Sequence, residues 1–303
     1  MDVWAGVVPA LVLLVGMCFV PETPRWLLSK GRLKECRKVL QKIEPENTVN
    51  DLIGQMEVEI EKDRNSAVGW RYLMQPWLRT PLMIAVCIMF FQQFVGINTV
   101  IYYSPKIFLM AGFESTLSAI WASVGIGIVN VVFTVISLYL VDRIGRRKLY
   151  FIGLSGIAFS VLCLSACFIY ANQLGEIGRW LMVIFMFGYV AFFAISIGPL
   201  GWLVISEIFP QKVRGLGTSI GSLAVWIFNC IVSFTFFKII DFFSIPGTEI
   251  VVGQTTSENP AGAFFLYGFI AVLGLVWGYL FLPETKGLSL EEIEQKWRKN
   301  REC

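Results

Sequence analysis

The sequence has 303 residues, of which 56% are hydrophobic and only 16% charged, and its formal net charge is +3. Soluble domains carry about 25% charged residues, so the composition excludes an ordinary soluble protein and indicates an integral membrane protein. The small net charge gives no support for nucleic-acid binding. The chain has no histidine, which excludes Ser–His–Asp or Cys–His catalysis and imidazole metal sites within it.

The seven cysteines form no CxxC pair, and most of them lie in apolar runs. Cysteine in such a run behaves as a small hydrophobe. We therefore expect no disulfide framework, no zinc or other metal site and no cofactor. With no catalytic constellation in the sequence, we expect a protein that is not an enzyme.

Seven apolar runs are long enough to cross a bilayer as helices, because a span needs about 20 residues. They are residues 3–20, 82–105, 117–141, 149–171, 180–206, 215–237 and 263–282. The first run lacks the basic start and small-residue cleavage site of a signal peptide, and it ends at Pro21 and Glu22. We interpret it as a true span.

The basic residues predict the orientation of these spans. Of the 25 Lys and Arg residues, 22 lie in segments 21–79, 142–148, 209–214 and 283–303. Alternating connections place all four segments on one side of the membrane. The excess of basic residues marks that side as cytoplasmic, so the C-terminus is expected inside and residue 1 outside.

The long connection, residues 21–79, has the composition of a soluble segment. It is basic over 25–42 and acidic over 44–63. Two sets of apolar residues recur with a helical period, and they are Leu33, Cys36, Val39, Leu40 and Ile43, followed by Leu52, Ile53, Met56 and Ile60. The pattern predicts two or three short amphipathic helices on the cytoplasmic face.

A Pro-Glu-Thr triplet occurs twice, at 21–23 after the first span and at 283–285 after the last, with six spans between. Transporters are often built from two six-helix halves. The repeat predicts four parts: 1–20 as the last helix of a first half, 21–79 as a linker, 80–282 as a six-helix bundle and 283–303 as a tail. Five helices of the first half would then be missing.

Six stretches carry a family resemblance. They are PETPRWLLSKGR at 21–32, FQQFVGINTVIYYSPKIF at 91–108, VDRIGRRKL at 141–149, GPLGWLVISEIFPQKVRG at 198–215, VWIFN at 225–229 and PETKGLSLEEIE at 283–294. The chain resembles the sugar porter family of the major facilitator superfamily. The resemblance implies an all-α membrane protein with a partial major-facilitator fold, and transport of a monosaccharide or polyol by alternating access, as uniport or proton symport.

The uncharged interior of the spans supports a neutral ligand independently. No span carries an Asp, Glu, Lys or Arg in its middle, as an ion pump or proton relay requires. The polar side chains that remain are Gln92, Gln93, Asn98, Asn130, Thr134 and Asn229. Side-chain amides offer both donors and acceptors, and sugar hydroxyls need both.

The second span holds the first group of expected site residues. By resemblance, the sugar-binding residues of this span are Gln92, Gln93 and Asn98, and Tyr102 and Tyr103 lie at the outer gate. The three amides would not share one face of an ideal helix. Gly96 is expected to break the helix, and Ser104-Pro105 to break it again. The alternative is that the amides only join neighbouring helices.

The remaining expected binding residues lie in three later spans. By resemblance they are Asn130, Trp202, Trp226 and Asn229, while Gly198 and Pro199 form a flexible inner gate in a kinked helix. Trp202 alternatively belongs to an interfacial aromatic belt. Ala194 and Val225 stand where glucose transporters have Glu and Asn. The change at Val225 removes a hydroxyl partner, which argues against glucose itself as the preferred sugar.

Charged residues cluster at the cytoplasmic helix ends. They are Glu22, Arg25, Asp142, Arg143, Arg146, Arg147, Glu207, Arg214 and Glu284. By resemblance, they form salt bridges that stabilise the outward-open state. The alternative is that they only set orientation, but orientation does not require the acidic members.

Two other functions remain open from the sequence. A membrane sugar sensor would bind without translocating, and a truncated transporter would do neither. Sensors of the family carry long cytoplasmic tails, whereas segment 283–303 is short. The expected partners are a neutral sugar or polyol, the lipid bilayer and, in a symporter, protons.

Overall fold

The computed structural model describes residues 2–65, 70–113, 115–244, 250–252, 255–287, 292 and 297. The chain divides into two compact units, Met1–Val68 and Gly69–Cys303. The second unit begins ahead of the 80–282 range expected for the bundle. Each unit is described by itself.

The first unit contains four helices. They are α1 (Asp2–Phe19), α2 (Pro24–Ser29), α3 (Leu33–Leu40) and α4 (Glu46–Asn65). The hydroxyl of Thr23 accepts a hydrogen bond from the N–H of Trp26 and caps α2, whose first residue is Pro24. Threonine at the cap and proline at the first helical position are both typical of a helix start.

Helices α2, α3 and α4 share a small hydrophobic cluster, which confirms the predicted amphipathic helices. Its buried residues are Leu27, Leu28, Cys36, Leu40, Val49 and Ile53, and Val39, Met56 and Ile60 pack against them. Leu33 and Ile43 follow the same period but are exposed. Burial raises the pKa of the Cys36 thiol, with a further contribution from Glu57, so this cysteine stays neutral and packs as a hydrophobe.

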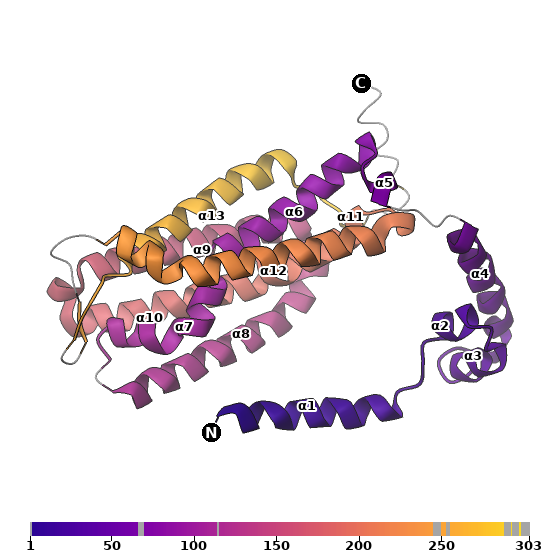
Figure 1. The fold of residues 1–303 in the computed structure, drawn as a ribbon, viewed down its shortest axis with the longest axis horizontal. Coiled ribbons are helices and arrows are strands. Elements are labelled where there is room, and N and C mark those ends of the chain that lie inside the picture. Colours follow the sequence, from indigo (N-terminus) through magenta and orange to yellow (C-terminus); the bar gives the residue numbers. More distant parts are fainter. Residues whose placement is uncertain are drawn as a thin grey trace. The chain divides into compact units, whose positions relative to one another are not determined.

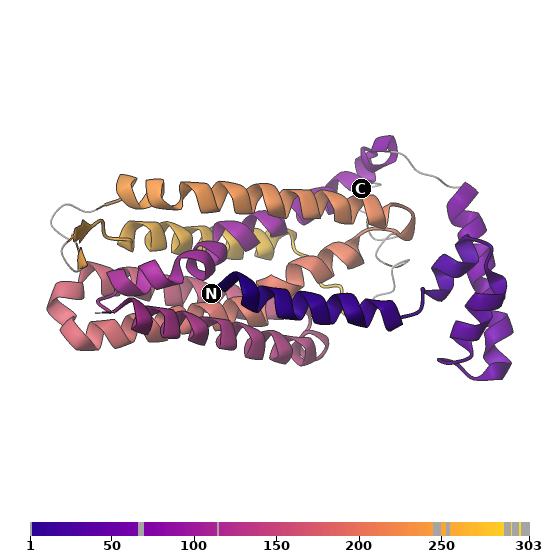
Figure 2. The ribbon, with the colours of Figure 1, turned by 60° about the horizontal axis from the view of Figure 1, so that its bottom comes forward.

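The second unit is a bundle of long helices whose axes run side by side (Figures 1 and 2). Its helices are α5 (Trp70–Leu73), a 3-10 turn (Pro76–Leu78), α6 (Arg79–Phe94), α7 (Ile97–Met110), α8 (Thr116–Ile144), α9 (Arg146–Ile169), α10 (Ala171–Ile195), α11 (Ile197–Ile208), α12 (Gln211–Phe242) and α13 (Ala261–Phe281). Helix α9 packs against α10 and α13, α12 against α6, and α8 against α10 and α7.

Three helix junctions follow from backbone conformation. Gly96 has φ +87° and separates α6 from α7, and Gly145 has φ +94° and separates α8 from α9. Glycine adopts these values without a steric penalty. Ser196 lies outside the helical region, with φ −127° and ψ −104°, and separates α10 from α11.

Two expectations about helix breaks need correction. Helix α7 continues through Pro105 to Met110, so no second break occurs at Ser104-Pro105. Helix α7 packs on α8 and α12, and a proline inside a packed helix can kink the helix without ending it. The kink expected at Gly198–Trp202 lies just before these residues, at Ser196, and the residues themselves belong to α11. Pro199 fits the first turn of α11, where a missing N–H costs no intrahelical bond.

Six segments among the described residues have the length and apolar composition to cross a membrane. They are Pro76–Met110, Thr116–Ile144, Arg146–Ile169, Ala171–Ile208, Val213–Phe242 and Ala261–Phe281, which correspond to the last six predicted spans. In α1, the described apolar segment is shorter, Ala10–Phe19, so the first span stays a prediction.

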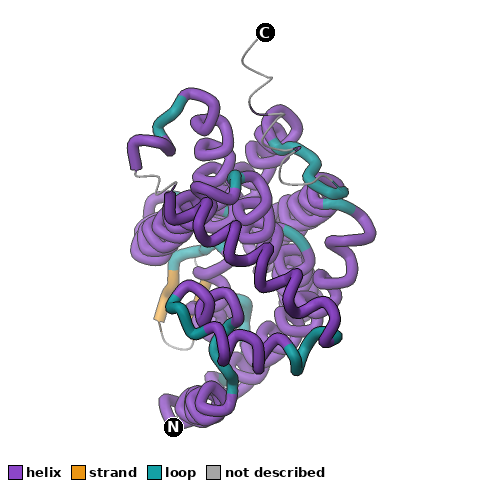
Figure 3. The backbone as a smooth tube through the Cα atoms, turned by 90° about the vertical axis from the view of Figure 1, so that its right-hand side faces the viewer, coloured by secondary structure: helices purple, strands orange, loops and turns teal. Residues whose placement is uncertain are grey.

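The structure is nearly all helical (Figure 3), with one departure from the all-α expectation. Strands β1 (Ile250–Val252) and β2 (Thr255–Ser257) pair antiparallel in the connection between α12 and α13. β-branched residues dominate both strands, and they favour extended structure. The hairpin is too short to give a strong periodic signal in the sequence.

Candidate sugar site and helix-end network

The break between α6 and α7 brings three predicted site residues together. The side-chain N–H of Asn98 donates to Oε1 of Gln93 at 2.6 Å, and that of Gln93 donates to Oε1 of Gln92 at 3.2 Å. We call these three residues the amide chain. An ideal helix would separate them, and the left-handed Gly96 turns α7 so that Asn98 reaches back to Gln93.

The amide chain ends on the junction between α10 and α11. Nε2 of Gln92 donates to the carbonyl of Ile197 at 3.1 Å and to the carbonyl of Gly198 at 2.7 Å. These carbonyls lie at the start of α11, where they are also placed to accept the first intrahelical bonds, and Gln92 is an additional donor to them. Gln92 and Gln93 are only 3% and 6% exposed. The two amides are therefore preorganised, and only Asn98 of the three is partly accessible.

Gly198, Pro199 and Trp202 lie on α11 beside this chain. A Cβ atom at Gly201 would lie 2.9 Å from Nε2 of Gln92, so glycine allows α11 to approach the amide. Trp202, the next residue, is 43% exposed. Its ring is therefore accessible to a ligand or to another part of a larger assembly.

Asn229, an expected site residue on α12, makes contact with α7. The amide of Asn229 donates to the Tyr102 hydroxyl at 3.4 Å, and its Oδ1 accepts from the Ser233 hydroxyl at 3.0 Å. Tyr103 stacks on Phe236, with ring centroids 5.4 Å apart. The expected gate tyrosines of α7 therefore rest on α12. Trp226, on the same helix, is 67% exposed.

Asn130 does not join the amide chain. Its carbonyl accepts from the Thr134 hydroxyl at 2.7 Å, a bond within α8. Its half-buried side chain makes no hydrogen bond to any described residue. Ser137, one turn further, is buried, and its hydroxyl finds no partner in the described part of the chain.

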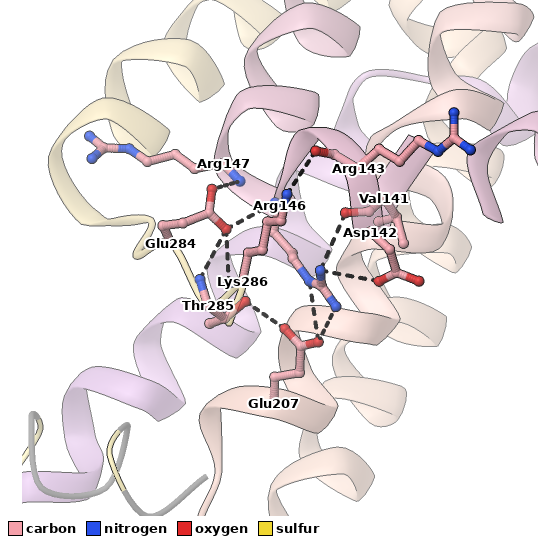
Figure 4. A network of polar contacts seen from close by, with 9 residues as sticks. All are labelled: Val141, Asp142, Arg143, Arg146, Arg147, Glu207, Glu284, Thr285 and Lys286. Carbon is pink, nitrogen blue, oxygen red and sulfur yellow. Dashed lines mark hydrogen bonds and ion pairs between the residues drawn. The ribbon is translucent and has the colours of Figure 1, made fainter. Parts of the chain in front are cut away.

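A second polar cluster joins the ends of α8, α9, α11 and α13, and we call it the helix-end network (Figure 4). Arg146 pairs with Glu207 at 2.8 Å and with Asp142 at 3.3 Å. The Thr285 hydroxyl donates to the other oxygen of Glu207 at 2.5 Å. The side chains of Arg146 and Glu207 are 12% and 20% exposed, whereas that of Asp142 is 75% exposed.

Glu284 caps the start of α9. Its two carboxylate oxygens accept from the backbone N–H groups of Arg146 at 3.0 Å and Arg147 at 3.1 Å. A carboxylate at a helix N-terminus satisfies unpaired donors and interacts favourably with the helix dipole. A Cβ atom at Gly145 would lie 2.9 Å from Oε2 of Glu284, so glycine is also needed for the approach.

The other basic residues of the network contact backbone carbonyls. Arg147 donates to the carbonyl of Tyr279 at 2.8 Å, and Lys286 donates to the carbonyl of Arg143 at 2.7 Å. Nε and Nη2 of Arg214 are buried without a partner in the described part of the chain. Thr285 and Lys286 also belong to the helix-end network, although neither is among the site residues expected from the sequence. Both lie in the Pro-Glu-Thr-Lys-Gly motif.

Glu22 and Arg25 belong to the first unit and are exposed there, at the start of α2. The tail beyond Gly287 lies outside the described residues except for 292 and 297. Within the described residues, no group of three or more Cys, Asp or Glu side chains could hold a metal ion.

Comparison with known proteins decides the family. The family described as "Sugar (and other) transporter" matches residues 2–297. The chain belongs to this family. It is a multi-pass membrane protein with a partial major-facilitator fold, as the resemblance implied.

Its relatives include sugar transporters of two bacteria. The chain is 36% identical over 293 residues to the glucose transporter GlcP of Staphylococcus epidermidis, covering 97% of this chain and 61% of that protein. It is 34% identical over 290 residues to the D-xylose-proton symporter of Escherichia coli, covering 96% of this chain and 55% of that protein. The chain therefore spans little more than half the length of these relatives.

Solved structures show the same fold. The proton:xylose symporter XylE bound to 6-bromo-6-deoxy-D-glucose matches with a TM-score of 0.72 and 33% identity, over 97% of this chain and 58% of that one. The inward open conformation of XylE from E. coli matches with a TM-score of 0.70 and 30% identity, over 96% and 55%.

Proposed function

We propose that this chain takes part in the transmembrane transport of a neutral monosaccharide or polyol by alternating access, as one bundle of a two-bundle transporter. The amide chain of Asn98, Gln93 and Gln92 carries the proposal. It places uncharged donors and acceptors at a helix break inside a bundle whose buried residues are mainly apolar. Transporters bind substrates at such discontinuous helices near the membrane midplane.

The chemistry of the site favours a polyol over a charged ligand. An amide both donates and accepts hydrogen bonds, and so does a hydroxyl. Within the described residues, none of the hydrogen-bond partners of the amide chain is an ionised side chain that could neutralise a phosphate, a carboxylate or an ammonium group, and burying such a charge unpaired is costly. Asn98 is the accessible end of the chain, so it is the proposed first contact of the sugar.

The other proposed binding residues are Trp202, Trp226 and Asn229, with Asn130 on α8. Both tryptophan rings are exposed, and a flat ring can pack on the C–H face of a pyranose. Tyr102 and Tyr103 are proposed to act at the outer gate, since both contact α12. Gly198 and Pro199 are proposed to act at the inner gate.

The helix-end network is proposed to stabilise the outward-open state from the cytoplasmic side, which is also the proposed side of the C-terminus. Within this bundle Arg146 and Glu207 already pair with each other. Arg214 has two buried N–H groups without a described partner. Arg214 is therefore the member proposed to bind an acidic group of a second bundle.

Sugar uptake tests the proposal. Cells that lack their own sugar porter would express residues 1–303 alone, or together with a six-helix half of a related transporter. We expect no saturable uptake from the chain alone, because alternating access needs two bundles around one site, and uptake after co-expression. Saturable uptake by the chain alone would contradict the two-bundle mechanism.

A panel of labelled monosaccharides and polyols, with and without a protonophore, would separate facilitated diffusion from proton symport. Tighter binding of a sugar phosphate or an amino acid than of any free sugar would contradict the neutral ligand. Specific binding of a sugar to purified protein, combined with no uptake even after co-expression, would favour a sensor.

A further inference from the structure

The break between α6 and α7 is held by side chains from three other positions in the bundle, none of which the motifs singled out as part of the site. They are Tyr189 on α10, Thr99 on α7 and Tyr267 on α13. All three are at most 1% exposed. Their contacts converge on two residues, Val95 and Gly96.

Tyr189 satisfies the carbonyl that the break leaves open. In a continuous helix the carbonyl of Val95 would accept the N–H of residue 99. Here the Tyr189 hydroxyl donates to the Val95 carbonyl at 2.8 Å. A buried carbonyl without a donor is costly inside a membrane protein, so this bond stabilises the broken helix over a continuous one.

Gly96 is fixed from two further sides. The Thr99 hydroxyl donates to the Gly96 carbonyl at 2.7 Å. A Cβ atom at position 96 would lie 2.3 Å from Cε2 of Tyr267, so the Tyr267 ring occupies the space that only glycine leaves free. The left-handed conformation of Gly96 is therefore determined by packing as well as by residue type.

The two helix junctions are tied to each other in both directions. Gln92, two residues before the end of α6, donates to the carbonyls of Ile197 and Gly198 at the α10–α11 junction. Tyr189, on the α10 segment that leads into that junction, donates to Val95 at the α6–α7 junction. The geometry of the amide chain at one junction thus depends on the position of α10.

We propose that Tyr189 is a positioning residue for the sugar site: its hydroxyl holds the Val95 carbonyl and so fixes the break that brings Asn98 onto Gln93. The inference rests on the proposed function, because it names a residue that supports the same site. Tyr189 does not contact the ligand. It acts by keeping α7 in the orientation from which Asn98 completes the amide chain.

The test compares Tyr189→Phe with Tyr150→Phe in the full 303-residue chain, purified in detergent. Tyr150 is a matched control, because it is equally buried and its hydroxyl donates to the Gly274 carbonyl at 2.9 Å, joining α9 to α13. Hydrogen–deuterium exchange of the backbone amides of residues 95–100 is the first readout. We expect exchange there to be about tenfold faster in Tyr189→Phe and unchanged in Tyr150→Phe.

Binding of D-glucose and D-xylose is the second readout. We expect about tenfold weaker binding in Tyr189→Phe, corresponding to the loss of one buried hydrogen bond, and no change in Tyr150→Phe at a similar loss of thermal stability. Equal exchange in the two variants, or faster exchange with unchanged affinity, would overturn the positioning role.

Failure of the proposed function would look different. If no protein, including the unmodified chain, bound any sugar of the panel, the sugar site would be wrong. Exchange at residues 95–100 needs no ligand, so it would still decide whether Tyr189 holds the break and the amide chain in place.

Discussion

The amide chain and the helix-end network are both polar clusters that join several helices, but they use different chemistry. The amide chain consists of neutral groups, and Gln92 and Gln93 are 3% and 6% exposed. The network consists of ionised groups, and the side chains of its central pair, Arg146 and Glu207, are 12% and 20% exposed. Ionised groups are tolerated where water reaches them, at the helix ends, whereas the interior keeps only groups whose desolvation cost is modest.

The two clusters also differ in how far their polar groups find partners within this chain. Each hydrogen bond of the amide chain ends on another amide or on a backbone carbonyl, so the chain is complete without a ligand. Arg214, which the resemblance groups with the residues of the network, has two buried N–H groups without a partner in the described part of the chain. The first cluster is therefore suited to recognise a small molecule, and the second to pair with another protein surface.

The largest effect on stability is expected from Arg146→Ala. The change leaves Glu207 partly buried without its cation and removes a bond to Asp142 and to the Val141 carbonyl. Loss of hydrogen bonds to a charged group predicts a decrease of roughly 1.5–3 kcal/mol in the free energy of unfolding. Thermal unfolding in detergent measures it. An unchanged midpoint would mean that the network sets orientation alone.

Next in size, Gln93→Ala and Asn98→Ala are each expected to weaken sugar binding by about 1–3 kcal/mol, because hydroxyl partners of the sugar are left unsatisfied. The proteins should still insert into the membrane. Gln173→Ala, at an exposed amide on α10, is the control and should bind normally. Unchanged affinity in both test variants would show that the amide chain is structural and not a binding site.

Glu284→Ala is expected to cost about 1 kcal/mol of stability, the usual value of a helix cap. The variant removes the acceptor of the backbone N–H groups of Arg146 and Arg147 at the start of α9. Glu284→Gln keeps one acceptor oxygen, so its free energy of unfolding should decrease less. Equal losses in the two variants, measured by thermal unfolding, would show that the carboxylate charge and not the hydrogen bonding matters.

The smallest effect is expected from Asp142→Asn, at most about 0.5 kcal/mol, because exposed ion pairs contribute little. The Asp142 side chain is 75% exposed although it shares Arg146 with the partly buried Glu207. Comparing Asp142→Asn with Glu207→Gln in the same unfolding assay isolates the effect of burial on one arginine. A decrease in stability for Asp142→Asn as large as that for Glu207→Gln would contradict the role assigned to burial.

Much of the fold could be predicted because a membrane span is recognisable from a continuous apolar run in the sequence. The last six apolar runs correspond to the six candidate spans, and Gly96 does end a helix. A kink was expected at Gly198–Trp202, since Gly and Pro are the residues that commonly disturb a helix, whereas the interruption lies at Ser196, a residue type that carries no such signal. The linker helices were predicted, but Leu33 and Ile43 follow the apolar period without being buried, because a period marks a face and not what covers it.

The sequence by itself determined the class of this protein. Composition, span length and the motifs were enough to predict a membrane-embedded member of the sugar porters and to select Gln92, Gln93 and Asn98 as site residues. Only the tertiary structure decided how those residues are connected. The bonds from Gln92 to the Ile197 and Gly198 carbonyls and from Tyr189 to Val95 join residues about a hundred positions apart. A backbone carbonyl has no sequence signature, and a buried tyrosine resembles any other aromatic core residue, so neither contact exists until the helices pack.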